Sequence, residues 1–165
     1  MYTVLVKPDL QAICARAARE CTAFSLRRAS RALSSFYDER MAKSGLRGTQ
    51  FNLLTALAVA GDLPMTRLAS VLDLDRTTLT RNLRPLETGG LVASVPTEDR
   101  RVRLVHLTAK GRTALARALP LWEATQDHVV RALGEAGWRK LVDGLAAVAA
   151  IASHSDTRDA AHDPD

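Results

Sequence analysis

Residues 63–112 constrain the fold of this chain most, because they combine two short helical patterns with two strand-like ones. The second helical pattern, between Asp75 and Thr88, carries Arg, Thr and Asn on one side and leucines on the other. Two alternating stretches follow, Leu91–Val95 and Val102–Leu107, joined by a charged tip. This order predicts a helix-turn-helix followed by a β-hairpin, and nothing else in the chain suggests chemistry.

Capping residues mark the ends of the second helix of this motif. Asp75 is a good N-cap, since its carboxylate can accept the free amides of Thr77 or Thr78. The Gly89-Gly90 pair favours a left-handed C-cap, which ends the helix at Thr88. We expect Thr108 to cap the helix that follows the hairpin.

Most of the remaining sequence has helical periodicity, with apolar residues three and four apart. Aromatic residues make up only 4% of the chain against 47% hydrophobic residues, which also favours a mainly helical body. We expect further helices over these ranges: 9–43; from a Thr49 cap to Gly61; 65–72; from Thr108 to Leu133 with a bend at Pro120; and 138–151.

These elements predict a mainly α (α+β) fold, a winged helix-turn-helix with a two-stranded wing and N- and C-terminal helices. The terminal helices are too apolar on one face to be stable alone, and the helix-turn-helix core is too small to cover both. We therefore expect both chain ends to interleave with those of a second copy, with arms folded back on their own domain as the alternative. The expected division is as follows: N-terminal arm and dimerisation helix, 1–45; DNA-binding lobe, 46–107; C-terminal dimerisation helices, 108–153; disordered acidic tail, 154–165.

The overall charge suits a polyanionic partner such as DNA, since the formal net charge is +5 at pH 7. No stretch is apolar for as long as a membrane span, and the N-terminus lacks the basic and apolar regions of a signal peptide, so we expect a cytoplasmic protein. The histidines and cysteines show no metal-binding spacing, and no phosphate-loop, dinucleotide or metalloprotease motif is present. We therefore expect no enzyme activity, no metal and no cofactor.

The run from Leu68 to Val92 and the sequence DRRVRLVHLTAKG that follows it resemble the MarR family of winged helix-turn-helix regulators. The strongest elements are Leu68-Ala69, Arg81, Leu86-Glu87, Gly90-Leu91, Asp99-Arg100-Arg101, and Leu107-Thr108 with Gly111. The resemblance spans roughly residues 20–150. It implies a triangular homodimer with a DNA-binding lobe at each lower corner, and a regulator, commonly a repressor, that releases DNA on meeting a ligand or an oxidant.

Major-groove recognition requires side chains that present hydrogen-bond donors from the first turns of a helix. The helix after Asp75 offers Arg76, Thr77, Thr78, Thr80, Arg81 and Arg84. Arg81 is the best candidate for a bidentate contact to guanine, with a phosphate contact as the alternative. Thr78 and Thr80 can instead support the helix locally. Two copies related by a two-fold axis would read a palindrome with half-sites roughly 34 Å apart.

The predicted wing supplies Arg100, Arg101 and Arg103, which can reach an adjacent minor groove or its phosphates. The family motif places the tip arginine at Arg101, and a solvated charged turn is the alternative for the whole tip. The rival to a DNA-binding regulator is a winged-helix module that binds proteins and not DNA. Such modules tend to lose the basic residues that this chain keeps.

Two cysteines bear on signal sensing. On one continuous helix Cys14 and Cys21 would lie about 10 Å apart, too far for an intrachain disulfide. Some members of the family sense organic peroxides through a cysteine on this helix. When Phe24 and the run Ala29-Ser30-Arg31-Ala32 are aligned with the family, that position falls at Ala23. Buried apolar packing is therefore the expected role of both thiols, and a thiol-based redox regulator is the alternative.

A small aromatic or lipophilic effector is implied only by the resemblance. The residues that could line its pocket are Phe24, Arg28, Phe36, Phe51 and Trp122. Arg28 would meet a carboxylate, although each of the five can equally serve the core.

Overall fold

The computed structural model describes residues 9–97 and 102–159, with side chains up to residue 151. It divides into two compact units, Met1–Leu119 and Pro120–Asp165. The elements are α1 (Leu10–Glu20), α2 (Thr22–Met41), η1 (Ala42–Ser44), α3 (Gly48–Ala60), β1 (Leu63–Pro64), α4 (Met65–Val71), α5 (Arg76–Thr88), β2 (Val92–Pro96), β3 (Arg103–Leu107), α6 (Ala109–Leu133) and α7 (Glu135–Asp159). The division between the units falls within α6, so the first turns of α6 belong with the winged helix-turn-helix.

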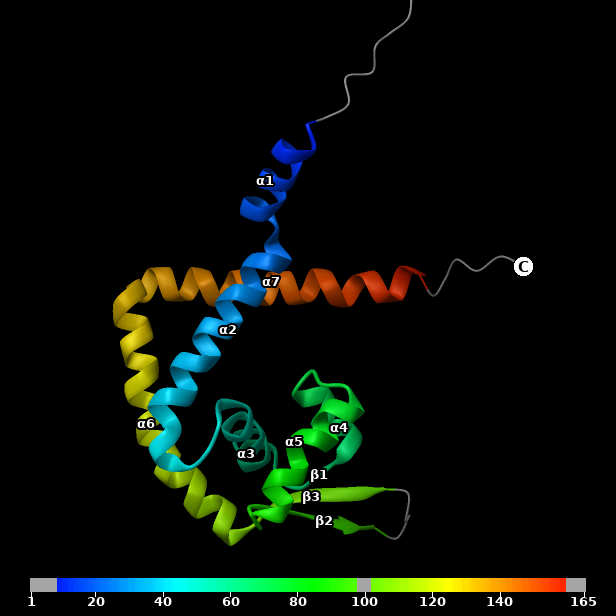
Figure 1. The fold of residues 1–165 in the computed structure, drawn as a ribbon. Coiled ribbons are helices and arrows are strands. Elements are labelled where there is room, and N and C mark those ends of the chain that lie inside the picture. The colour runs from blue at the N-terminus through cyan, green and yellow to red at the C-terminus, as the bar shows by residue number, and fades with distance from the viewer. Residues whose placement is uncertain (1–8, 98–101, 160–165) are drawn as a thin grey trace, which may run out of the picture. The chain divides into compact units, whose positions relative to one another are not determined.

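Leucines on the inner sides of three helices form the core of the first unit. Leu54 of α3, Leu68 of α4 and Leu79 of α5 have no exposed surface. Leu83 and Leu86 of α5 are only 2% and 1% exposed, so α5 buries one apolar stripe at helical spacing. Each such leucine contributes roughly 1.5–3 kcal/mol of transfer free energy. Figure 1 shows α3, α4 and α5 gathered beside the sheet.

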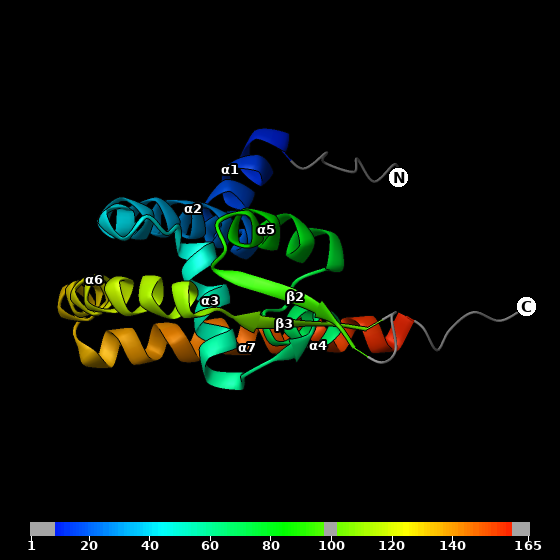
Figure 2. The ribbon, with the colours of Figure 1, turned by 90° about the horizontal axis from the view of Figure 1, so that it is seen from below.

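The sheet has three antiparallel strands in the order β1-β3-β2. The predicted hairpin is confirmed, with Val92 opposite Leu107 and Pro96 opposite Arg103. Strand β1 adds a third member, with Leu63 opposite Val105. The sequence did not predict β1, because two residues are too few to show alternation. In Figure 2, α5 lies alongside the ribbon formed by β2 and β3.

The predicted caps around α5 and α6 are confirmed. Asp75 Oδ1 accepts the Thr78 amide at 2.8 Å, and Gly90 has the left-handed φ of 68°. Thr108 Oγ1 accepts the Gly111 amide at 3.0 Å at the start of α6. These short-range signals are readable from sequence because donor and acceptor lie within one turn of each other.

The cap predicted at Thr49 is wrong. Helix α3 begins two residues earlier than that cap implies, at Gly48, with Arg47 as its N-cap residue. Gln50 Oε1 accepts the Arg47 amide at 2.9 Å, and the Gly48 amide donates to Asp38 Oδ1 at 2.6 Å. Since Asp38 lies on α2, a carboxylate distant in sequence satisfies an amide that a local cap would otherwise serve.

The single helix expected over 9–43 is also wrong, because the helix is interrupted at Cys21. Cys21 has φ −69° and ψ 109°, although its amide still reaches the Ala17 carbonyl at 3.0 Å. Cysteine and the β-branched Thr22 are both weak helix formers, and no residue of α1 is buried to hold the helix straight. Because α1 runs to Glu20 and Cys21 is its C-cap residue, the helical spacing between Cys14 and Cys21 still applies.

In the second unit, Gly134 has a left-handed φ of 69° and separates α6 from α7. Helix α7 begins before the predicted Trp138 and extends to Asp159. Residues 154–159, expected in the disordered tail, are therefore helical, since no Gly or Pro interrupts them; residues 160–165 lie outside the description. Pro120 lies inside α6, and the bend expected there stays a prediction. None of the described helices is apolar over a length that could cross a membrane.

Candidate nucleic-acid interface

Helix α5 presents two chemically distinct faces. Its leucines are buried on the inner face, whereas Arg76, Thr77, Arg81 and Arg84 are exposed on the outer face. Thr77 and Arg81 are four residues apart and Arg84 is three further on, so they share one side of the helix. The leucine stripe therefore fixes which side of α5 the cations occupy.

The outer face of α5 borders a shallow concavity of about 500 Å³. Its lining residues are Arg76, Thr77, Thr80, Arg81, Arg84 and Pro85. Within the described ranges, the only carboxylate within 4 Å of an arginine or lysine nitrogen belongs to the Arg139–Glu135 pair, which is on α7. The arginines of α5 therefore have no such acid beside them and remain available to phosphates and base edges.

The threonines of α5 differ in what their hydroxyls do. Thr78 Oγ1 donates to Asp75 Oδ2 at 2.6 Å, and Thr80 Oγ1 donates to the Arg76 carbonyl at 2.8 Å. Both hydroxyls support the helix locally, which was the alternative for these two residues. Thr78 is also half-buried and lies outside the concavity.

Asp75 holds the start of the helix with both carboxylate oxygens. The Thr78 hydroxyl and the Thr78 amide both donate to it, and these hydrogen bonds lower its pKa below the usual value. The carboxylate therefore stays charged at the positive end of the helix dipole. Its position fixes the first turn of α5, which carries Arg76 and Thr77.

At the end of β3 nearest the wing tip, Arg103 Nη2 donates to the Ser94 carbonyl at 3.0 Å across the hairpin. The Ser94 hydroxyl in turn donates to Glu87 Oε1 on α5. Arg103, Arg76 and Thr80 border a second concavity of about 430 Å³ between α5 and the strands. The structure thus brings Arg103 to the recognition helix. Arg100 and Arg101 lie outside the described residues.

Sequence reasoning missed the link between Glu87 and Ser94. In the sequence Glu87 belongs to the family motif and Ser94 to a strand, and neither position indicates a contact between them. The pair joins α5 to β2, so no pattern within either element could reveal it. A carboxylate near the end of a helix, where the dipole disfavours it, was the one available signal.

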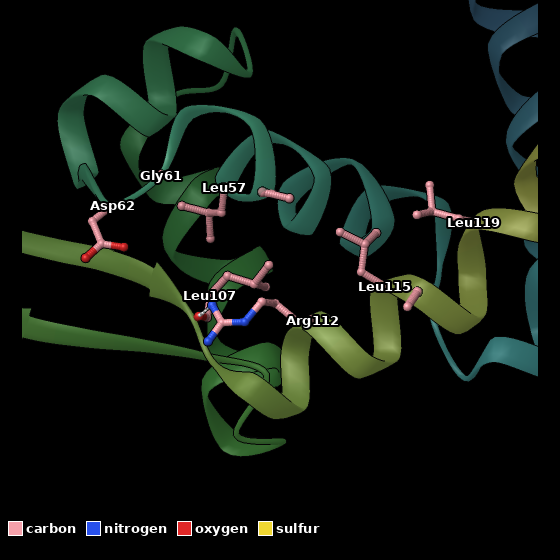
Figure 3. A pocket seen from close by; sticks show the side chains of 9 residues that line it. Leu57, Gly61, Asp62, Leu107, Arg112, Leu115 and Leu119 are labelled. Carbon is pink, nitrogen blue, oxygen red and sulfur yellow. Dashed lines mark hydrogen bonds between the residues drawn. The ribbon is translucent and has the colours of Figure 1, made fainter.

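A third concavity, of about 290 Å³, lies between α3, β3 and the first turns of α6 (Figure 3). Its walls are mostly apolar, with Leu57, Leu115 and Leu119 among them. Arg112 lines it and donates from Nη1 to the Leu107 carbonyl at 2.8 Å.

None of the five residues expected to line an effector pocket borders this concavity. Phe51 is 4% exposed and belongs to the core, while Phe36 lies beneath the Arg40 guanidinium at 3.6 Å. Phe24 and Arg28 are exposed on α2, and Trp122 belongs to the other unit. Their role as ligand contacts stays a prediction.

The burial expected for the two cysteines is not found within the chain, because Cys14 and Cys21 are both free and exposed. Helix α1 buries none of its residues and Cys21 is exposed at its end, so no apolar pocket among the described residues receives either thiol. In the described part of the chain, no three His, Cys, Asp or Glu side chains gather in a way that could hold a metal ion.

A helix-turn-helix with an exposed cationic second helix and a hairpin wing defines a winged-helix DNA-binding protein. The family model described as the MarR family matches residues 44–101. A structure of the M. tuberculosis transcriptional regulator MosR in complex with DNA is 37% identical, and the alignment covers 82% of this chain and 98% of that one with a TM-score of 0.77. The chain belongs to the MarR family and is a DNA-binding transcriptional regulator.

Two further solved structures are similar. The transcriptional repressor CouR bound to a 23-mer DNA duplex is 29% identical, covering 81% of this chain and 95% of that one, with a TM-score of 0.74. A mutant of E. coli MarR complexed with operator DNA is 22% identical, covering 86% of this chain and 99% of that one, with a TM-score of 0.73, and supports the fold alone. No curated protein sequence matches the chain.

Proposed function

We propose that this regulator binds palindromic duplex DNA as a homodimer and represses transcription by occupying the site. The observation that carries the proposal is the outer face of α5, where exposed arginines surround a concavity with no acid paired to them among the described residues. Arg81 contacts a guanine edge or an adjacent phosphate, and Arg76 and Arg84 contact the backbone. Arg103, together with Arg100 and Arg101, contacts the DNA beside the major groove.

Dimerisation is supported by apolar side chains that a single chain leaves exposed. In the first unit, Leu10 is 75% exposed and Phe24 is 51% exposed. In the second unit, Leu145 is 44% exposed and Ile151 is 73% exposed. Large apolar surfaces of this kind mark protein interfaces, and a second copy related by a two-fold axis covers them symmetrically.

Repression follows from occupation of a promoter, and the similar protein CouR is described as a transcriptional repressor. CouR has also been solved with p-coumaroyl-CoA bound. For this chain we place effector binding at the concavity beside Arg112, whose guanidinium can meet an acid while leucines hold an apolar body. The Leu107 carbonyl, which ends β3, would lose its donor when an acid recruits Arg112.

Selection of bound duplexes from a random pool tests the proposed function. The expected product is an inverted repeat whose half-sites are about one helical turn apart, with two protein chains on each duplex. The stoichiometry is measured by light scattering of the complex. Recovery of a non-repeated site bound by one chain, or of no enriched duplex at low salt, would contradict the proposal.

A further inference from the structure

The hydroxyl of Thr80 is occupied within its own helix. It donates to the Arg76 carbonyl at 2.8 Å, and a threonine hydroxyl carries only one hydrogen to donate. Thr80 is nevertheless exposed and borders both concavities beside α5. The Thr80 hydroxyl can therefore accept a hydrogen bond but cannot donate a second one, and the methyl group is what Thr80 offers to an apolar partner at this surface.

Thr77 on the same face behaves differently. Within the described residues, no hydrogen bond joins its hydroxyl to another group, so that hydroxyl is free to donate or accept. The outer face of α5 thus presents, three residues apart, one threonine whose hydroxyl can donate a hydrogen bond and one whose hydroxyl cannot. The two can distinguish different features of a base pair.

The surroundings of the Thr80 methyl favour nucleic acid as its partner. Arg76 precedes Thr80 by one turn and Arg84 follows it by one turn, so cations flank the methyl along the helix axis. Arg81 stands beside it at the edge of the same concavity. A nucleic acid whose phosphates contact these arginines would bring an apolar group of one of its bases against the Thr80 methyl.

We propose that Thr80 recognises a thymine through the 5-methyl group of that base. The inference rests on the proposed function, because it requires α5 to lie in the major groove. In that groove thymine alone among the four bases presents a methyl group, and apolar contact with it is an established means of recognition. The methyl of Thr80 then selects thymine over cytosine at one position in each half-site.

Uracil substitution isolates this contact, because deoxyuridine differs from thymidine only by the methyl group. Each thymine of a selected half-site is replaced in turn, and Kd is measured for the full-length protein. At one position the replacement is expected to raise Kd roughly fourfold, the value of one buried methyl-sized group. The same position carrying 5-methylcytosine, paired with guanine, is expected to bind more tightly than one carrying cytosine.

Two variants assign the contact to Thr80. In Thr80→Ser the hydroxyl and its bond to Arg76 remain but the methyl is lost. The uracil penalty, which is the ratio of Kd for the uracil duplex to Kd for the thymine duplex, is therefore expected to fall to about one at that position. In Thr80→Val the methyl remains without the hydroxyl, and the uracil penalty is expected to persist. Thr113→Ser is the matched control, since Thr113 is exposed on α6 and makes the same bond to the Ala109 carbonyl at 3.1 Å.

The outcomes separate this inference from the function on which it depends. A uracil penalty that persists in Thr80→Ser, or the absence of any penalised thymine, would overturn the role of Thr80. If Arg81→Ala still weakens binding in that case, α5 reads DNA by other contacts and the proposed function stands. If neither Thr80→Ser nor Arg81→Ala changes binding to any duplex, both proposals fail.

Discussion

Gly111 of α6 lies so close to Leu91 that a Cβ on the glycine would stand 2.0 Å from the Leu91 carbonyl oxygen. The same carbonyl accepts the Thr108 amide at 3.1 Å. The Thr108 hydroxyl donates to the Gly90 carbonyl at 2.7 Å, at the end of α5. The first turn of α6 is thus attached directly to the segment that joins the recognition helix to the wing.

Gly111→Ala is expected to destabilise the protein, because the new methyl meets backbone that cannot move aside. Overpacking of this kind lowers the free energy of unfolding by about 1–3 kcal/mol, and we expect a value near the upper end of that range here. Thermal unfolding should show the loss as a lowered Tm. Gly144→Ala is the control, since a Cβ there would meet no atom within 4 Å apart from its chain neighbours and the nearby backbone of α7, and alanine there should stabilise the helix slightly. Equal Tm values for the two variants would contradict the observed contact.

Asp75→Asn should show a stability difference from wild type that depends on pH. The hydrogen bonds from Thr78 lower the pKa of Asp75 in the folded state. The charged carboxylate therefore adds stability above its unfolded pKa, and that stability is lost as the pH falls through the lower folded pKa. Asparagine keeps a capping oxygen but not the charge.

The measurement for Asp75 is the Tm of both proteins between about pH 7 and pH 3. Wild type should be the more stable at pH 7, and the gap should close in the acid range. Asp75→Ala, which removes the cap altogether, should lower Tm at pH 7 by roughly 2–4 °C. A gap between wild type and Asp75→Asn that does not change with pH would refute the linkage.

Leu145→Glu should weaken self-association, because a charge on the exposed apolar surface of α7 opposes its burial. Light scattering is expected to show a shift from dimer toward monomer, with DNA affinity falling at the same time. Val59→Glu is the control: Val59 is 84% exposed on α3 and is not part of the proposed dimer surface. A dimer that survives in Leu145→Glu would place the contact elsewhere.

Arg103→Ala should reduce the salt dependence of DNA binding. If Arg103 neutralises one phosphate in each half-site, the slope of log K against log salt should lose about one unit of magnitude for each copy. Affinity at low salt should fall for every duplex alike, since a phosphate contact carries no sequence information. An unchanged slope would limit Arg103 to its hydrogen bond with Ser94 inside the hairpin.

The recognition helix was the most predictable part of the molecule because its signals are local. The Asp75 cap, the leucine stripe and the glycine pair each operate within a turn or two of the residues they organise. The interruption of the helix at Cys21 could not be predicted in this way, since no Gly or Pro marks the boundary between α1 and α2. Periodicity continues through it unchanged.

Contacts between elements were not predictable. The amide of Gly48 is satisfied by Asp38 from another helix, and Glu87 reaches Ser94 across the gap between a helix and a strand. A pattern within one element cannot say which distant residue will meet it. Thr80 is an intermediate case, because its sequence position allows its hydroxyl either to donate to DNA or to support the helix locally. Its hydrogen bond to the Arg76 carbonyl assigns the hydroxyl to the second role.

The most direct test of the account is the Kd of Arg81→Ala for the duplex that wild type selects. Arg139→Ala is the matched control, since Arg139 is exposed on α7 and pairs only with Glu135 among the described residues, at 3.3 Å. We predict that Arg81→Ala raises Kd roughly tenfold or more and relaxes selection at one base pair, while Arg139→Ala binds as wild type does. Equal Kd values for Arg81→Ala and wild type, with the same selected sequence, would contradict the assignment of α5 as the reading helix.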